Sequence, residues 1–215
     1  MWLRFCISIF LFPVISWSQV TITYNPIFKQ ELTSDSLRNN QFQLTHLSFY
    51  IGHVELLNDN KSVAQLSDYY LIDLTDSTKN KLNFPLASDL VFNRMRFQIG
   101  IDSSVIENGV MSGDLDPMNG HFWSWQSGYI HFKLEGEFLD KPITYHIGGA
   151  SAPTNTLQTV ILPVKSINQH VTIAVTLDPI IAWLKKTNDR EIMSPSLVAV
   201  EFSTLFHQLF QATNR

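Results

Sequence analysis

The sequence predicts a mainly β fold: an antiparallel β-sandwich or barrel-like domain with a C-terminal helix. Short stretches in which apolar and polar residues alternate recur along the chain, separated by turn residues, as expected for strands with one buried face. The one long helical pattern comes late, at residues 194–210. The chain has 215 residues, of which 45% are hydrophobic and 16% charged, so it has enough apolar material for a sizeable core.

The N-terminus has the features of a secretory signal peptide. Arg4 precedes an apolar stretch from residue 5 to residue 15, and Ser16 and Ser18 are the small residues that signal peptidase requires. The stretch is too short for a comfortable transmembrane helix. We therefore expect cleavage after Ser18. The segment 19–215 would be one mature domain in the periplasm or outside the cell, and not an integral membrane protein.

The position of the cysteine agrees with a division into a signal peptide and a mature domain. The only cysteine, Cys6, lies inside the expected signal peptide. The mature domain therefore has neither a disulfide nor a thiolate metal site.

In the first half of the chain, alternation predicts strands at four places. These are residues 20–24, 47–56, 69–74 and 91–99, the last with Val91, Met95, Phe97 and Ile99 facing inward. The apolar parity changes after Gly52, which predicts a β-bulge there. Residues 101–120 are rich in Asp, Ser, Asn and Gly, and we expect a long loop.

The second half predicts a hairpin, a further strand and two helices. Residues 130–134 and 143–147 alternate on either side of a turn at Asp140, and residues 171–177 alternate again. Asp178 and Pro179 can open a short helix. Ser194 can cap a second helix that runs to Phe210 and buries Phe202.

The charge and the motifs exclude several functions. The net charge of −4 is unsuited to a nucleic-acid partner. The chain carries no signature of a hydrolase elbow, a zinc protease or a phosphate loop, so we expect no enzyme activity. Asp102, Asp114 and Asp116 could hold calcium, but their spacing is not that of an EF-hand. These three acids and Glu135 could also pair for glycoside hydrolysis, the least favoured alternative.

Two tryptophans mark the densest group of functional candidates. Trp123 and Trp125 lie in the run from Gly120 to Tyr129, at a spacing that puts both on one face of a strand. Such a pair is commonly part of a core. The same spacing also suits a platform for sugar rings, so a carbohydrate-binding β-sandwich module is an alternative function.

The histidines are the other candidates, because imidazole is a common ligand for copper and similar metals. His146 faces away from Ile143 and Tyr145, and His131 faces away from Ile130 and Phe132. If their strands pair through the turn at Asp140, the two histidines can share a face. Periodicity alone equally allows two solvated strand histidines.

Several segments together resemble the MbnP-like family. The most specific is Trp123-Ser124-Trp125-Gln126-Ser127-Gly128-Tyr129. Weaker matches are Leu47 to Ile51, Leu71 to Asp73, Phe97 to Asp102, Phe132 to Gly136, Tyr145 to Gly149 and Ile192 to Pro195. They follow one another in order over essentially the whole mature chain.

The resemblance implies an exported copper-binding protein that takes part in copper acquisition or handling. By position, it implies oxidation of Trp123 or Trp125 to kynurenine by a di-haem peroxidase-like partner enzyme, with His146 as a copper ligand. His121 departs from the family pattern, in which Met is common. The candidate ligands are therefore His146, helped by His121 or His131, with Trp123, Trp125 and Tyr129 lining the site. A cysteine-free site of this kind favours copper, as Cu(I), over structural zinc.

Overall fold

The structure is a computed structural model. It describes residues 17–27, 38–39, 42–66, 68–87, 90–108, 111–123, 128–165 and 170–213. The predicted β fold is confirmed: the described residues form fourteen strands together with short helices. Trp125 and nearly all of the expected signal peptide lie outside these residues.

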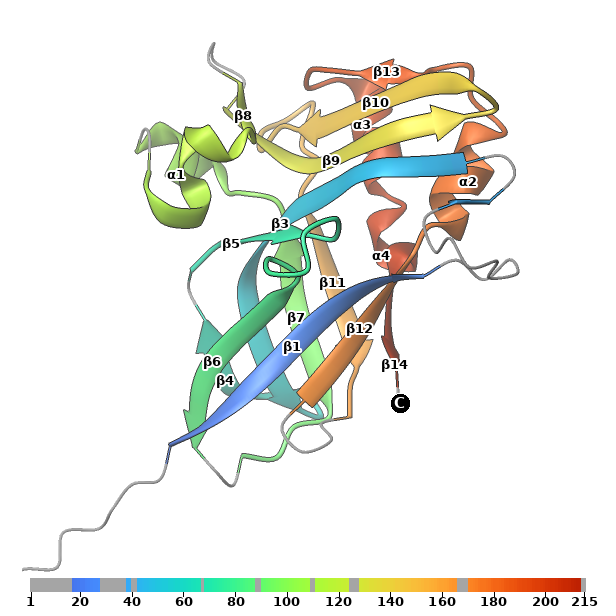
Figure 1. Ribbon diagram of the computed structural model, residues 1–215. Coiled ribbons are helices and arrows are strands. Elements are labelled where there is room, and N and C mark those ends of the chain that lie inside the picture. The colour runs from blue at the N-terminus through green and yellow to red at the C-terminus, as the bar shows by residue number, and fades with distance from the viewer. Residues whose placement is uncertain are drawn as a thin grey trace, which may run out of the picture.

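The strands form a large sheet and a smaller one, which curl around each other (Figure 1). The larger sheet has the order β11-β7-β3-β9-β10-β13, with β2, β4 and β5 paired to β3. The smaller has the order β14-β12-β1-β6. The strands of the larger sheet are β2 (Arg38–Asn39), β3 (Phe42–Asn58), β4 (Lys61–Leu66), β5 (Tyr70–Asp73), β7 (Arg94–Ile99), β9 (Gly128–Phe138), β10 (Lys141–Gly148), β11 (Gln158–Pro163) and β13 (Glu191–Ile192). The strands of the smaller are β1 (Trp17–Ile27), β6 (Lys81–Ala87), β12 (His170–Thr176) and β14 (Phe210–Thr213). A short strand, β8 (Phe122–Trp123), pairs with β9.

Most of the neighbouring strands are antiparallel, as predicted, but two pairs are parallel. β1 pairs parallel to β12, and β10 pairs parallel to β13. The hairpin of β9 and β10 turns at Asp140, and the register of β3 against β7 shifts after Gly52. Both features confirm the sequence interpretation.

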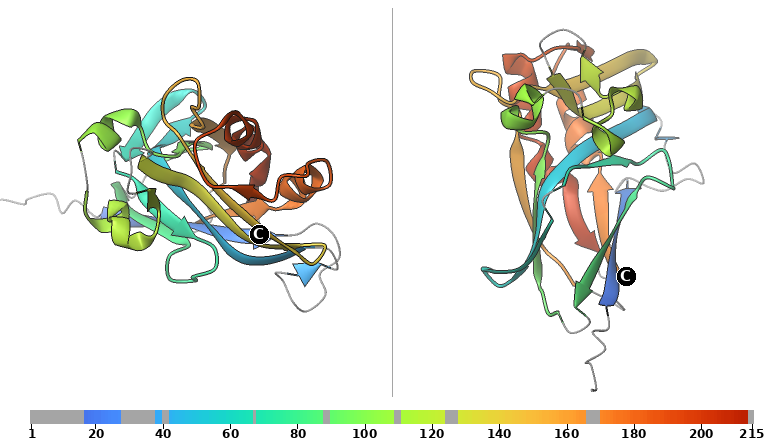
Figure 2. Two further views of the ribbon diagram at one scale, coloured as in Figure 1. Left: turned by 90° about the horizontal axis from the view of Figure 1, so that it is seen from above. Right: turned by 90° about the vertical axis from the view of Figure 1, so that its left-hand side faces the viewer.

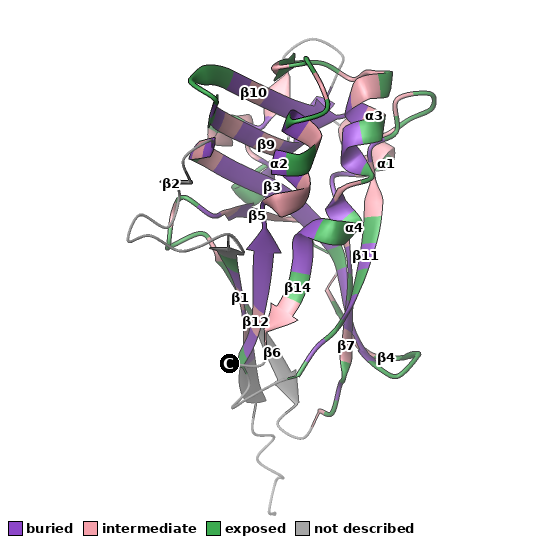
Figure 3. Cartoon of the chain, turned by 90° about the vertical axis from the view of Figure 1, so that its right-hand side faces the viewer, coloured by how far each residue is buried: buried purple, intermediate pink, exposed green. Residues whose placement is uncertain are grey.

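The main core lies between the two sheets and under the C-terminal helices. Tyr24 of β1 packs against Phe49, Phe97 and Phe210 in T-shaped, edge-to-face arrangements, so both sheets contribute to one aromatic cluster. The helices α2 (Asp178–Leu184), α3 (Leu197–Ser203) and α4 (Phe206–Leu209) bury their apolar sides against it. Figure 3 shows the buried residues running along β12 and through the middle of β3, β9 and β10.

The opposite face of β3 and β9 is covered by the segment that follows β7. This segment holds the helix α1 (Ser103–Glu107) and the 3-10 turns η1 (Gly113–Leu115) and η2 (Pro117–Asn119). A small second cluster of Tyr50, Ile101, Leu115 and Tyr129 joins it to the sheet. Seen from above, the covering segment and the C-terminal helices lie on different sides of the β9–β10 hairpin (Figure 2).

Three expectations need correction. Residues 101–120 are not one irregular loop, because they include these three short helical turns. Val91 is 69% exposed, since β7 begins only at Arg94.

The third concerns the C-terminal helix. Ser196, not Ser194, caps α3, with its hydroxyl accepting the amide of Ala199 at 3.1 Å. The helix also ends before Phe210. That residue opens β14, which pairs with β12 because the free edge of the smaller sheet offers backbone partners there. In the described residues, no helix is long and apolar enough to cross a membrane.

Candidate functional site

A row of polar side chains crosses three strands on the covered face of the larger sheet. Ser48 of β3 lies opposite Lys133 of β9, which in turn lies opposite His146 of β10. In the next row, His46 lies opposite Glu135. Side chains directly opposite each other in neighbouring strands are about 5 Å apart at Cβ. The row therefore brings His46 and His146 to one small area.

His121 joins this area from the segment that leads into β8. Its Nε2 lies 2.6 Å from the hydroxyl of Ser48, and Nε2 of His46 lies 2.7 Å from the same hydroxyl. Two imidazole nitrogens thus point at one oxygen. The backbone holds His121 in place, since the amide of Ile130 donates to its carbonyl at 2.9 Å. His46, His121 and His146 are called the histidine cluster below.

The hydrogen bonds determine the tautomers of His121 and His46. Nδ1 of His121 lies 3.0 Å from the carbonyl of Ile130, which can only accept, so Nδ1 carries the proton. Burial lowers the pKa of His121 to about 4, so the ring is neutral at pH 7 and Nε2 holds a lone pair. The hydroxyl of Ser48 therefore donates to His121. It accepts in turn from Nε2 of His46, whose pKa is also lowered by burial.

His146 is oriented by a carboxylate. Its Nε2 lies 2.9 Å from Oε1 of Glu135, and Nζ of Lys133 lies 3.4 Å from the same oxygen. Burial lowers the pKa of His146. Burial raises the pKa of Glu135, but the hydrogen bond from His146 and the charge of Lys133 outweigh it and lower that pKa. A neutral His146 thus donates Nε2–H to an ionised Glu135 and keeps a lone pair on Nδ1. Carboxylates orient metal-binding histidines in this way.

Trp123 packs on β10, the strand that carries His146. A Cβ added to Gly148 would meet the six-membered ring of Trp123 at 2.7 Å, so the indole rests directly on the backbone two residues after His146. Trp123 is partly buried and is neither a core residue nor an open platform. Tyr129, the other expected lining residue, is fully buried and donates its hydroxyl to the carbonyl of Leu115 at 2.8 Å. It supports the covering segment.

His131 has different surroundings from His146. The pairing of β9 with β10 passes from Phe132 directly to Ile130, so His131 is the extra residue of a bulge and the simple alternation stops there. His131 is fully buried, its Nδ1 lies 3.0 Å from Oγ1 of Thr156, and its ring fills the space left by the missing side chain of Gly100. This environment is that of a structural histidine.

Sequence reasoning did not single out His46. Its position could have been found, because His46, Ser48 and Tyr50 alternate on the face of β3 opposite to Leu47 and Phe49.

The acids considered as calcium ligands have separate partners. Asp102 binds His53, Tyr69 and Gln98, whereas Asp114 accepts the amide of Leu71.

Comparison with known proteins shows which family the chain matches. A family model described as MbnP matches residues 18–194. The solved structure of MbnP from Methylosinus trichosporium has a similar fold, with a TM-score of 0.59 and 13% sequence identity, covering 86% of this chain and 88% of that chain. At this identity, the structural similarity bears on the fold alone. The search of curated proteins found no match.

Proposed function

This chain belongs to the MbnP family, and on that basis we propose that it is an exported, non-catalytic protein that binds copper, as Cu(I), for acquisition or handling of the metal. The observation that carries the proposal is the histidine cluster. His46 and His121 point Nε2 atoms at one hydroxyl, 2.7 and 2.6 Å away, and His146 with Trp123 lies beside them.

The donor set suits Cu(I) better than zinc. In the described part of the chain, no three histidine, cysteine or acidic side chains lie together in a group that could hold a metal ion. The arrangement is a convergent pair of imidazoles with a third nearby. Structural zinc requires four firm ligands, whereas Cu(I) accepts two or three nitrogens.

Both members of the convergent pair have the partners that ligands need. His121 already has its lone pair on Nε2 and its proton on Nδ1, bonded to Ile130. For His46 to offer Nε2, its proton must move to Nδ1. That atom lies 3.4 Å from the hydroxyl oxygen of Thr75, which donates its own proton to Asp73. Such outer partners stabilise the ligating tautomer. Copper would replace Ser48 as the partner of both rings.

The proposal includes oxidation of a tryptophan to kynurenine by a di-haem peroxidase-like partner, which would add a donor beside the histidines. Trp123 is favoured among the described residues, because its ring packs on Gly148 in the strand that carries His146. The glycan-binding alternative gains no support from Trp123, since a ring that rests on Gly148 is not a free stacking platform.

Removing single histidines should weaken copper binding. We expect His46→Ala, His121→Ala and His146→Ala each to lower the affinity for Cu(I) at least about tenfold, or ~1.4 kcal/mol, because each removes one nitrogen donor. The measurement is a titration of Cu(I) against a competing chelator. Circular dichroism checks that each variant is folded. The matched control is His170→Gln, which changes an exposed histidine of β12 and should bind as the parent protein does.

Unchanged affinity in all three variants would contradict the proposed metal site.

A mass spectrum of protein from its native cell envelope tests whether a tryptophan is oxidised. Trp123→Phe and Trp125→Phe then separate the two indoles, since only one should abolish the modification. If native material carries neither copper nor modified tryptophan, the copper function is wrong.

Export is the second testable part of the proposal. The order of charged, apolar and small residues at the N-terminus favours cleavage after Ser18, which would leave β1 nearly whole, since that strand begins at Trp17. N-terminal sequencing of protein from the cell envelope should find Gln19 first. Finding Met1 there would contradict the proposal.

A further inference from the structure

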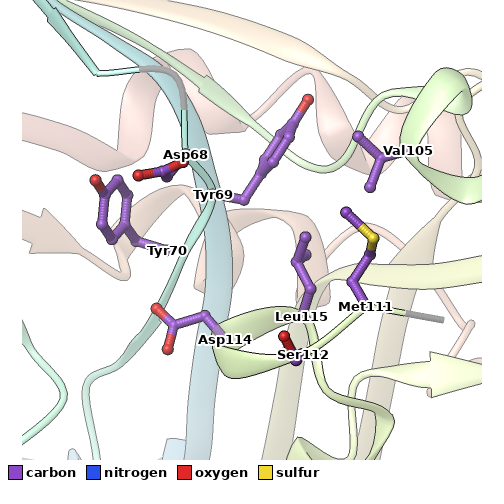
Figure 4. Close-up of a pocket in the computed structure, with 8 residues that line it drawn as sticks. All are labelled: Asp68, Tyr69, Tyr70, Val105, Met111, Ser112, Asp114 and Leu115. Atoms are coloured by element: carbon purple, nitrogen blue, oxygen red, sulfur yellow. The ribbon is translucent and has the colours of Figure 1, made fainter. Parts of the chain in front are cut away.

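A hollow separate from the histidine cluster lies between β5 and the covering segment (Figure 4). Its volume is about 900 Å³, within the range of pockets that hold small organic molecules. Asp68, Tyr69 and Tyr70 form one wall, and Val105, Met111 and Asp114 belong to the other. None of the described residues that line it is a histidine.

Hydrogen bonds and close packing hold the walls in place. The hydroxyl of Tyr50 donates to the carbonyl of Asp114 at 2.8 Å, and that of Tyr129 donates to the carbonyl of Leu115, so η1 is tied to both β3 and β9. The ring of Tyr69 packs directly on Gly52, where an added Cβ would meet it at 2.5 Å, and its hydroxyl donates to Asp102. A wall held in this way needs little reordering when a ligand binds.

The lining has negative charge and no positive charge. Among the described lining residues, Asp68 and Asp114 are acidic and none is a lysine, arginine or histidine. Neither acid forms an ion pair with a described residue. One oxygen of Asp114 accepts the amide of Leu71 at 3.0 Å. Both acids lie near the hydroxyl of Tyr70. Burial raises the pKa of Tyr70, and the charges of Asp68 and Asp114 and a hydrogen bond with Asp68 raise it further.

The apolar part of the lining defines the rest of the ligand. Tyr69, Val105, Met111 and Leu115 offer aromatic, aliphatic and thioether surface to an apolar body. A tyrosine ring also attracts a cation placed over its face. An anion would meet only repulsion, and a neutral ligand would cover the carboxylates without neutralising them. A bare hard metal ion would find only two carboxylates among the described lining residues, whereas such ions take six or more oxygen ligands.

We propose that this hollow binds a small organic cation, an ammonium or guanidinium group on an apolar body, with Asp68 and Asp114 pairing the charge and Tyr69 and Met111 contacting the body. The site is independent of the proposed copper function, because it shares no side chain with the histidine cluster.

Three probes of one shape and different charge test the proposal. Phenethylamine, 2-phenylethanol and phenylacetate are titrated into the mature protein by calorimetry at low salt. We expect the amine to bind and the alcohol and the acid to bind much more weakly or not at all. Added salt should weaken the binding of the amine, since Asp68 and Asp114 are both exposed to solvent and salt screens such charges.

Charge-removing variants locate the site. Asp68→Asn and Asp114→Asn should each weaken binding of phenethylamine at least about threefold, and the double variant about tenfold. In Asp114→Asn the new side-chain carbonyl can still accept the amide of Leu71, so the fold is kept. Glu191→Gln, an exposed acid on β13, is the matched control and should have no effect. Equal binding of all three probes, no binding of the amine, or an unchanged double variant would each overturn the proposal. A parallel Cu(I) titration should be the same in every variant, so a failure here is distinct from a failure of the copper function.

Discussion

Replacing Phe202 with aspartate is expected to remove most of the stability of the domain. Phe202 of α3 is fully buried, and its ring lies 6.0 Å from that of Phe132, 5.1 Å from Tyr145 and 5.8 Å from Trp183. Truncation of such a phenylalanine costs about 3–5 kcal/mol. A carboxylate in the same place adds the cost of burying an unpaired charge. Since domains are stable by about 5–15 kcal/mol, little would remain.

Urea denaturation of the parent protein, Phe202→Ala and Phe202→Asp measures this effect. The alanine variant should lose about 4 kcal/mol and remain measurable, and the aspartate variant should lose more. Leu197→Asp is the control on the same helix, because Leu197 is 68% exposed and should change the stability by no more than about 0.5 kcal/mol. An aspartate variant as stable as this control would show that α3 does not pack on the sheet as described.

Acidification to pH 5 should also destabilise the protein strongly. Burial lowers the pKa of His121 to about 4 and that of His131 to about 3, whereas both titrate near 6.5 in the unfolded chain. Below pH 6.5 the unfolded chain binds protons that the folded protein does not. The contribution of these two histidines to the stability is therefore fully present above pH 6.5. It is lost as the pH falls toward their pKa values in the folded protein. Between pH 7 and pH 5, two such groups remove about 4 kcal/mol.

The free energy of unfolding at pH 7, 6 and 5 tests this. His46 and His146 act in the same direction, because burial lowers their pKa values too. His131→Gln should reduce the loss between pH 7 and pH 5 by about 2 kcal/mol, the share of one such group, whatever its effect on the stability itself. His170→Gln should leave the loss unchanged. A stability that is flat over this range would mean that the two buried histidines are not held neutral by the fold.

Part of the candidate site could be predicted from the sequence. Alternation in residues 130–134 and 143–147 predicted the β9–β10 hairpin, and the segment matches singled out His146 and Trp123. The structure places Trp123 on Gly148, close to His146 in the chain. The pairing of His121 with His46 could not be predicted, because Ser48, which joins them, is 73 residues from His121. No local pattern encodes which distant strands become neighbours.

His131 shows a second limit of sequence patterns. Its alternation with Lys133 suggested that it shares a face with His146. A bulge inserts one residue where the register shifts, and that residue is His131. Unlike Gly52, whose effect on the apolar parity is visible in the sequence, this bulge follows from the way β9 meets the end of β10.

The sequence by itself determined the elements whose signals are local: the alternating strands, the bulge after Gly52 and the helix at Asp178. Each depends on residues within a few positions of one another, whose side chains share one face. Only the tertiary structure decided the fate of Phe210, whose spacing fits a helix but which forms β14, because the edge of β12 satisfies its backbone. It also decided the histidine cluster and the hollow beside Tyr69, since both arise where the segment after β7 folds back over β3 and β9.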